Sequence, residues 1–106
     1  MYYIYMLRCE DNSIYTGITS DIDRRMEEHF SKDKKCAKYT ATHNAKKLEC
    51  LWETENRVLA SKLEFHIKKG LNKSQKERLI LNPELLGNLL GEKIESDKYK
   101  NKKKEM

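Results

Sequence analysis

The pattern at the start of the chain constrains the fold most strongly. Tyr2–Arg8 and Ile14–Ile18 are short runs rich in aromatic and aliphatic side chains, and the cluster Glu10-Asp11-Asn12-Ser13 lies between them. Asp, Asn and Ser favour turns because their short polar side chains bond to the local backbone. Two such runs joined by such a cluster are typical of a β-hairpin. The chain is therefore expected to begin with two paired strands.

A helix over residues 21–30 is expected directly after this hairpin. Thr19 and Ser20 are candidate N-caps, because their hydroxyls can accept a hydrogen bond from the first helical turn. The inner stripe of this helix would consist of Ile22, Met26 and His29 or Phe30. Residues 31–47 are polar and lysine-rich and are expected to be loop, with a short extended piece at residues 38–40.

The next stretch predicts a third strand and a long helix. Leu48–Thr54 alternates as a strand does. Arg57–Lys69 carries an apolar residue at every fourth position, which indicates an amphipathic helix, and Gly70 is a candidate for its C′ position. The apolar stripe of that helix is Leu59, Leu63 and Ile67.

Two further helical segments are expected toward the C-terminus. Ser74–Glu77 fits a capping box that would open a helix running to about Leu81. Asn82 as N-cap and Pro83 at the first position would then begin a last helix over residues 83–95. Its stripe of Leu86, Leu90 and Ile94 must pack on something, because Gly87 and Gly91 each weaken the helix by roughly 1 kcal/mol.

The order of these elements predicts an α+β fold with a three-stranded layer. A chain of 106 residues is one domain by size. We expect residues 1–81 to form the main domain, residues 82–95 a helical extension, and residues 96–106 a disordered basic tail. That extension could pack on its own domain or on a second copy; a monomer is the preferred interpretation.

Net charge is weaker evidence for a nucleic-acid partner than its value suggests. The chain carries +5, but residues 96–106 alone hold five lysines and two acidic residues. Such a tail can raise nonspecific affinity for a polyanion, or it can be a solvated terminus. Charge alone favours the second interpretation.

The sequence favours a cytoplasmic protein. Its start lacks the features of a signal peptide, and no apolar run approaches the length of a membrane span. Cys9, Cys36 and Cys50 form an odd, scattered set, which argues against a disulfide framework. These cysteines and the three scattered histidines also lack the spacing of a zinc site.

Several short motifs together resemble one known family. Ile4-Tyr5-Met6-Leu7 and Tyr15-Thr16-Gly17-Ile18 resemble the two halves of the GIY-YIG nuclease signature, with Tyr3 and Thr16 as departures from it. Arg25 and His29 follow one helical turn apart, and residues 60–68, ASKLEFHIK, resemble the family's glutamate helix. The set is similar to the small single-domain bacterial branch called UPF0213 and covers about residues 2–80.

This resemblance implies an antiparallel three-stranded sheet flanked by helices, and a nuclease site on one face of the hairpin. The positions that match the family's catalytic residues are Tyr5, Tyr15, Arg25, His29 and Glu64. The family uses one divalent metal ion, Mg²⁺ or Mn²⁺, which Glu64 would hold. The expected activity is metal-dependent hydrolysis of phosphodiester bonds in branched, damaged or single-stranded DNA, in repair or recombination.

Chemistry at these positions is compatible with that activity. Glu64 offers the hard oxygen that Mg²⁺ prefers. Arg25 can bind a phosphate bidentately and stays charged at any working pH. Tyr5 is the candidate general base, provided that neighbouring cations lower its pKa from about 10. Tyr15 could orient water or phosphate, and His29 could move a proton or bind phosphate. We expect the five residues to converge on one concave surface.

Taken singly, each of these residues has an ordinary structural explanation. Tyrosines in strands usually pack, Gly17 can permit close packing, and Glu64 can pair with Lys68 at i+4. The segment 37–40, AKYT, resembles the branch's KYT segment, but residues 41–44 lack the arginines and proline expected there. Only the joint occurrence of the motifs supports a catalytic site.

Two alternative functions remain open. One is a non-catalytic nucleic-acid-binding module, and the other is a protein-interaction domain that uses the segment Leu85–Ile94. The candidate contacts with nucleic acid are the side chains of Lys38, Lys68, Lys69, Lys73 and Lys76.

Overall fold

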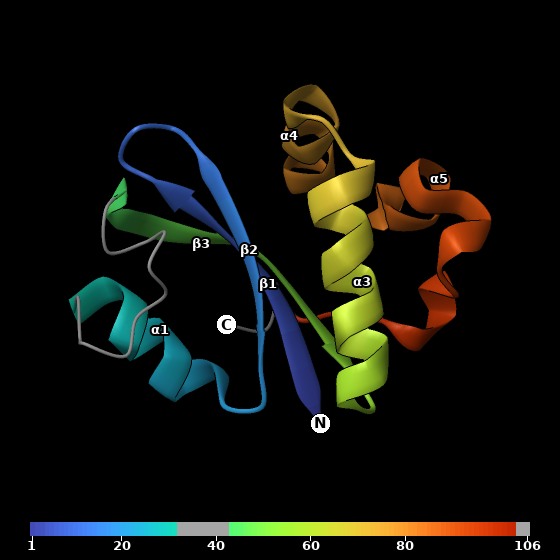
Figure 1. Ribbon diagram of the computed structural model, residues 1–106, viewed down its shortest axis with the longest axis horizontal. Helices are drawn as coiled ribbons and strands as arrows, with labels where there is room; N and C mark the ends of the chain where they lie inside the picture. The colour runs from blue at the N-terminus through green and yellow to red at the C-terminus, as the bar shows by residue number, and fades with distance from the viewer. Residues whose placement is uncertain (32–42, 104–106) are drawn as a thin grey trace.

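The computed structural model describes residues 1–31 and 43–103, which form an antiparallel sheet with helices on both faces (Figure 1). The strand order in the sheet is β2-β1-β3-β4, and every neighbouring pair is antiparallel. The strands are β1 (Tyr2–Cys9), β2 (Ile14–Thr19), β3 (Ala45–Thr54) and β4 (Lys100–Asn101). The α+β class expected from the sequence is confirmed, with one strand more than the three expected.

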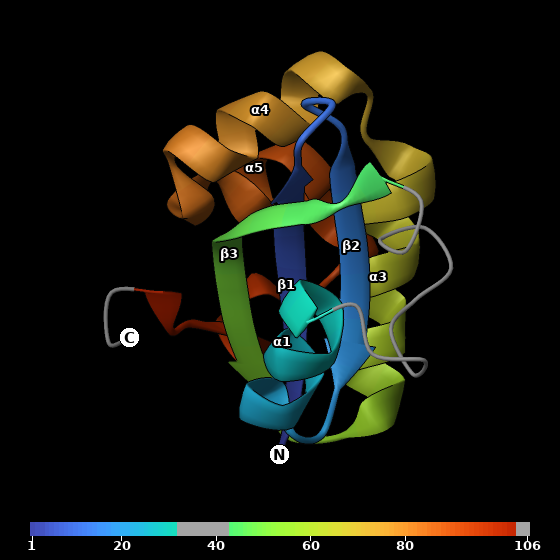
Figure 2. The same cartoon turned by 90° about the vertical axis from the view of Figure 1, so that its left-hand side faces the viewer.

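The helices divide unequally between the two faces. Helix α1 (Ile22–Ser31) lies alone on one face, and α3 (Arg57–Gly70), α4 (Lys73–Leu81) and α5 (Leu86–Leu90) lie on the other. Figure 2 shows α1 in front of the sheet, with α3 running along the β2 edge. Short 3₁₀ turns at Pro83–Leu85, Gly91–Lys93 and Ser96–Lys98 complete the C-terminal part. The described residues include no helix long and apolar enough to cross a membrane.

Alternation along β1 builds a core on each face of the sheet. Ile4 and Met6 point into the larger core, together with residues of α3, α4 and α5. Tyr5 and Leu7 point the other way, into a smaller core that α1 closes with Ile22 and Met26. Because successive side chains of a strand lie on opposite faces, the central strand is buried on both sides. The smaller core is the one that contains the candidate catalytic tyrosines.

Two predicted helix starts were wrong by one or two residues. Helix α1 is capped by Asp21, whose side chain accepts a hydrogen bond from the Arg24 amide, and not by Thr19 or Ser20. Helix α4 is opened by a capping box between Asn72 and Gln75. Asparagine caps as well as serine does, and a glutamine can complete the box, so the sequence offered two overlapping solutions.

The segment from residue 82 packs as predicted but is not one helix. Asn82 caps a 3₁₀ turn with Pro83 at its start, then α5 follows and ends at Gly91, whose φ is +56°. That left-handed conformation suits glycine and breaks the helix. The side chains of Leu86, Leu90 and Ile94 are all buried in the larger core, as their spacing indicated.

The expectation of a disordered tail was wrong for residues 96–103. Tyr99 is only 7% exposed, and its hydroxyl donates to the Leu59 carbonyl at 2.7 Å. The Thr54 hydroxyl donates to the Lys98 carbonyl at 2.9 Å, and β4 pairs with β3. One buried aromatic side chain therefore anchors a stretch whose lysine-rich composition predicted disorder.

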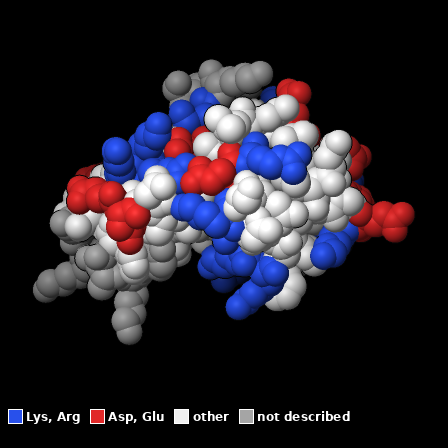
Figure 3. Space-filling view, turned by 90° about the horizontal axis from the view of Figure 1, so that it is seen from above, with Lys and Arg blue, Asp and Glu red and all other residues white. Residues whose placement is uncertain are grey.

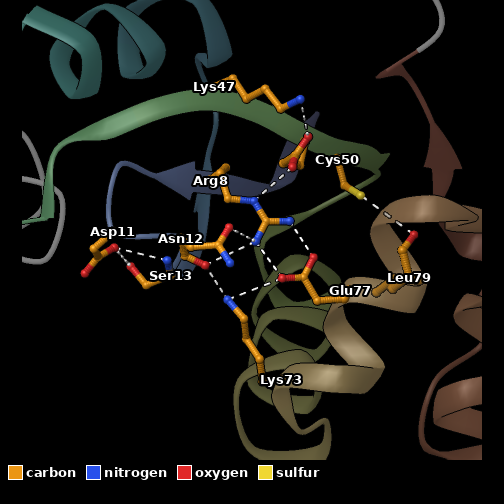
Figure 4. A network of polar contacts seen from close by, with 10 residues as sticks. Arg8, Asp11, Asn12, Ser13, Lys47, Cys50, Lys73, Glu77 and Leu79 are labelled. Atoms are coloured by element: carbon orange, nitrogen blue, oxygen red, sulfur yellow. Dashed lines mark hydrogen bonds and ion pairs between the residues drawn. The ribbon is translucent and has the colours of Figure 1, made fainter.

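An ion-pair network fastens the β1–β2 turn to α4 (Figure 4). Arg8 donates from Nη1 and Nη2 to the Glu77 carboxylate at 2.6 and 2.5 Å, and from Nε to Glu49 at 3.1 Å. Lys73 bonds to Glu77 and to the Asn12 carbonyl. The hydrogen bonds from Arg8 lower the pKa of Glu77 to about 2. This network holds α4 at a fixed place beside the hairpin.

Candidate active site

Strand register places the two signature tyrosines on the same face of the hairpin. Tyr5 lies opposite Gly17, and Tyr15 lies opposite Leu7. Because side chains alternate, all four positions face α1. The ring centroids of Tyr5 and Tyr15 are 6.2 Å apart. The sequence could not establish this common orientation, since it depends on the register that the turn selects.

Gly17 is required by the position of the Tyr5 ring. A Cβ atom at residue 17 would lie 2.5 Å from the Tyr5 hydroxyl oxygen and 3.0 Å from a ring carbon of Tyr15. The absent side chain leaves the space that the Tyr5 ring fills above β2. The glycine of the YIG-like segment therefore serves close packing between strands, one of the roles considered for it from sequence.

Helix α1 brings Arg25 and His29 to the Tyr5 hydroxyl. The distance from the Tyr5 oxygen to His29 Nε2 is 2.8 Å, and Arg25 Nε donates to the same oxygen at 3.4 Å. Arg25 also pairs with Glu28 at 2.9 Å. The His29 ring stacks at 5.4 Å from Tyr5 and 5.5 Å from Tyr15. One turn of helix between residues 25 and 29 is what lets both side chains reach one atom.

Burial determines the protonation of this cluster. Tyr5 and His29 are each only 1% exposed. Burial lowers the pKa of His29 to about 4, with the charge of Arg25 adding to the effect. Burial also raises the pKa of Tyr5, and the hydrogen bond from Arg25 offsets only part of that rise. At neutral pH, His29 is therefore uncharged and Tyr5 keeps its proton.

Arg25 donates a hydrogen bond to the Tyr5 oxygen. When neutral His29 carries its hydrogen on Nδ1, its Nε2 accepts the hydrogen of the Tyr5 hydroxyl. The condition set for Tyr5 as a general base, that neighbouring cations lower its pKa, is not met, because desolvation of the phenolate outweighs the nearby guanidinium. A neutral histidine that accepts the phenol proton takes the place of a pre-formed phenolate.

Glu64 lies at the edge of this cluster, on α3. Its side chain is 24% exposed and pairs with Lys68 at 3.4 Å. The Lys68 ammonium in turn lies 5.4 Å from the centroid of the Tyr15 ring. The charge of Glu64 also contributes to the raised pKa of Tyr5. The structure thus brings Tyr5, Tyr15, Arg25 and His29 into direct contact and connects Glu64 to them through Lys68.

The described residues enclose no pocket around the five side chains, and the concave surface expected there stays a prediction. Sequence reasoning also missed Glu28, which is half-buried and holds the Arg25 guanidinium. An i, i+3 spacing of acidic and basic residues on a helix was the available signal.

The donor set at this place fits a metal held by a single carboxylate. Within residues 1–31 and 43–103, no three His, Cys, Asp or Glu side chains gather as a metal cage. Mg²⁺ is commonly bound by one or two carboxylates together with water and substrate phosphate. Glu64 presents a partly exposed carboxylate beside the tyrosines, so it fits that pattern.

The candidate nucleic-acid contacts fall into two groups. Lys68 and Lys69 end α3, and Lys73 and Lys76 lie on α4, whereas Lys38 lies outside the described residues. Figure 3 looks onto the end of the molecule that carries α4 and the β1–β2 turn, and shows Lys and Arg side chains with acidic ones between them. The surface is therefore a set of separate cations and not a continuous basic patch.

Comparison with known proteins identifies the family and several relatives of this chain. The family model described as the GIY-YIG catalytic domain matches residues 1–78. The UPF0213 protein FN1575 of Fusobacterium nucleatum is 48% identical over 83 residues, which are 78% of this chain and 80% of the relative. The UPF0213 protein YhbQ of Escherichia coli is 39% identical over 100 residues, which are 91% of this chain and 97% of the relative.

A solved structure is also similar. The solution NMR structure of the UPF0213 protein BH0048 from Bacillus halodurans is 34% identical, with a TM-score of 0.49. The match covers 86% of this chain and 98% of that one.

Proposed function

The chain belongs to the GIY-YIG catalytic-domain family, and from this membership we propose that it is a metal-dependent endonuclease that hydrolyses phosphodiester bonds in DNA. The observation that carries the proposal is the Tyr5 hydroxyl, which contacts both Arg25 and His29. One hydrogen-bond partner would satisfy a buried tyrosine hydroxyl, and here two polar side chains of a separate helix contact it. The arrangement instead provides a proton donor and acceptor next to a fixed cation.

The proposed chemistry uses His29 as the final proton acceptor. As the attacking water loses a proton to the Tyr5 oxygen, Tyr5 passes its own proton to Nε2 of His29. Burial lowers the pKa of His29 to about 4, so its ring is neutral in the resting protein and stays a weak base until charge develops on the phosphoryl group. The positive charge that develops on His29 is compensated by the negative charge that develops on the phosphoryl group.

Arg25 and Tyr15 are proposed to position the phosphate. Arg25 stays charged, and Glu28 fixes its guanidinium at 2.9 Å, so the side chain is oriented before substrate binds. Tyr15 stacks against His29 and lies beside Lys68. Its hydroxyl is proposed to orient water or a phosphate oxygen.

Glu64 is proposed to hold Mg²⁺ or Mn²⁺. Once bound, the metal ion supplies Lewis-acid stabilisation of charge on the phosphate and leaving oxygen. Lys68, Lys69, Lys73 and Lys76 are proposed to contact the phosphate backbone, which positions a strand without reading its bases. Branched, damaged or single-stranded DNA, in repair or recombination, is the proposed substrate class.

We also propose that the protein acts as a monomer in the cytoplasm. Cys9 and Cys50 are both free and buried, which suits a reducing compartment. The stripe of Leu86, Leu90 and Ile94 is covered by the same chain and offers no apolar face to a second copy. For the same reason, the stripe does not support a protein-interaction surface.

A cleavage assay on branched and single-stranded DNA tests the proposal. In Mg²⁺, Glu64→Ala is expected to cleave no faster than wild type does when excess chelator has removed the metal. Arg25→Lys is expected to cleave about 10- to 100-fold more slowly than wild type in Mg²⁺. Glu92→Ala removes an exposed glutamate on a distant turn and should cleave like wild type. Losing the exposed pair with Lys68 should alter stability by only about 0–1 kcal/mol.

Two results would contradict the proposal. Undiminished cleavage by Glu64→Ala at matched Mg²⁺ would exclude Glu64 as the metal ligand. DNA binding with no metal-dependent cleavage in any of these proteins would instead support the non-catalytic binding module. That alternative draws on the raised pKa of Tyr5, which disfavours a phenolate.

A further inference from the structure

The ammonium group of Lys68 lies between the two parts of the candidate site. It is 3.4 Å from a Glu64 carboxylate oxygen and 5.4 Å from the centroid of the Tyr15 ring. Lys68 and Glu64 are one turn apart on α3, so their pairing needs no distortion of the helix. The Lys68 ammonium therefore already pairs with the Glu64 carboxylate, which is proposed to bind a divalent cation.

This ion pair is weak enough to be exchanged. The Lys68 side chain is 42% exposed, and that of Glu64 is 24% exposed. Exposed pairs of this kind are worth about 0.2–1 kcal/mol, whereas a divalent ion carries twice the charge of an ammonium group. A metal ion can therefore displace Lys68 at little cost to the fold.

The neighbours that α4 offers to Lys68 of α3 are positively charged. The pKa of Lys76 is lowered, first by burial and then by the positive charges of Lys73 and Lys68. Lys73 is already paired with Glu77 at 3.3 Å. Among residues 1–31 and 43–103, no carboxylate pairs with Lys76. If the Lys68 ammonium left Glu64, the positive charge of Lys76 would repel it unless an anion lay between the two groups.

We propose that Lys68 is an internal counter-cation of Glu64, which the metal ion displaces and which then binds a phosphate of the DNA strand. This inference rests on the proposed function. It gives Lys68 two successive partners, the carboxylate in the resting protein and a phosphate in the loaded one. Metal and DNA then increase each other's affinity. The metal releases Lys68 to bind phosphate, and phosphate that holds Lys68 leaves Glu64 available to the metal.

Removing the Lys68 ammonium should change the affinities for metal and for DNA in opposite directions. It frees Glu64, so the metal should bind more tightly. It also removes a phosphate contact, so DNA should bind less tightly once the metal is present. Loss of any nearby positive charge has the same two signs, so the role of Lys68 is distinguished by effects larger than those at another lysine of the same helix.

Calorimetric titration of Mn²⁺ into the full-length protein without DNA is the first test. Lys68→Met is expected to bind Mn²⁺ about two- to fivefold more tightly than wild type, which is the weight of an exposed ion pair. Lys62→Met is the matched control, since Lys62 is an exposed lysine on the same helix that makes no pair with Glu64. It should bind Mn²⁺ as wild type does.

The salt dependence of DNA affinity is the second test, measured with a phosphorothioate single strand that resists cleavage. In Mn²⁺, Lys68→Met should lower the slope of log affinity against log salt by about one, because one phosphate contact is lost. In chelator, where Lys68 remains on Glu64, its slope should match that of wild type.

The outcomes separate this inference from the proposed function. Equal Mn²⁺ affinities of wild type and Lys68→Met, with binding abolished in Glu64→Ala, would overturn the role of Lys68 alone. Equal tightening in Lys68→Met and Lys62→Met would overturn it too, as a nonspecific charge effect. No Mn²⁺ binding by wild type would overturn the inference and the metal ligation by Glu64 together.

Discussion

Three neighbours from two different elements hold the Tyr5 side chain. Its hydroxyl contacts Arg25 and His29, and the space beneath its ring exists because residue 17 is glycine. The types of these residues were recognisable in the sequence as a motif. Their contacts were not, since Tyr5 and Gly17 become neighbours only through the register of the hairpin.

Gly17→Ala is expected to damage both stability and activity. The added Cβ would have to lie 2.5 Å from the hydroxyl oxygen of a tyrosine that is itself fully enclosed. Overpacking of this kind typically costs about 1–3 kcal/mol. Urea denaturation should show that loss, and cleavage should fall because Tyr5 is displaced.

Gly70→Ala provides the comparison for that substitution. A Cβ atom at residue 70 would meet nothing closer than 3.9 Å, and the residue lies at the end of a helix. Its free energy of unfolding should be unchanged or slightly higher. A Gly17→Ala protein as stable as Gly70→Ala would show that the Tyr5 ring can move aside, and so is not fixed by β2.

At the scale of elements, apolar spacing predicted helices well and missed the last strand. The four-residue repeat of Leu59, Leu63 and Ile67 predicted α3 almost to its observed ends, because a single helix face packs on the sheet. Strand β4 contains Lys100 and Asn101 and has no such pattern. It forms because Tyr99 is anchored beside it, an effect of tertiary contact that local composition does not carry.

Tyr99→Phe tests that anchor with the loss of one atom. The hydroxyl donates to the Leu59 carbonyl at 2.7 Å, so its removal should lower the free energy of unfolding by about 0.5–1.5 kcal/mol. Lys98→Ala should be neutral in the same denaturation experiment, because Lys98 contributes its backbone carbonyl to Thr54. If Tyr99→Phe melts like wild type, the tail is held by something other than this contact.

At the scale of the whole molecule, α1 and the helices of the other face are each held against the hairpin by a separate set of contacts. The smaller core joins α1 to the hairpin, and the ion pair of Arg8 with Glu77 joins the hairpin to α4. The order of motifs in the sequence predicted that these parts meet. The ion pair was not predictable, because Arg8 and Glu77 lie far apart along the chain and resemble ordinary surface residues.

The buried histidine links the stability of the whole fold to pH. His29 has a pKa of about 4 in the folded protein, against about 6.5 when unfolded, so the unfolded chain binds the extra proton between these values. Stability is therefore complete above about pH 6.5 and is lost as pH falls toward 4. Glu77, with a pKa of about 2, loses its contribution only below about pH 4.5, so the two windows overlap only between about pH 4 and 4.5.

Denaturation at pH 7 and pH 5 measures the effect of His29. Wild type is expected to lose on the order of 2 kcal/mol of unfolding free energy between these values, and His29→Gln to lose much less, because glutamine does not titrate. Glutamine also keeps a polar side chain beside Tyr5, so the fold should survive the substitution. Equal losses in the two proteins would mean that the pKa of His29 is the same in the folded and the unfolded chain. The His29 ring would then not be desolvated against Tyr5, and the buried contact on which the proposed proton path depends would be absent.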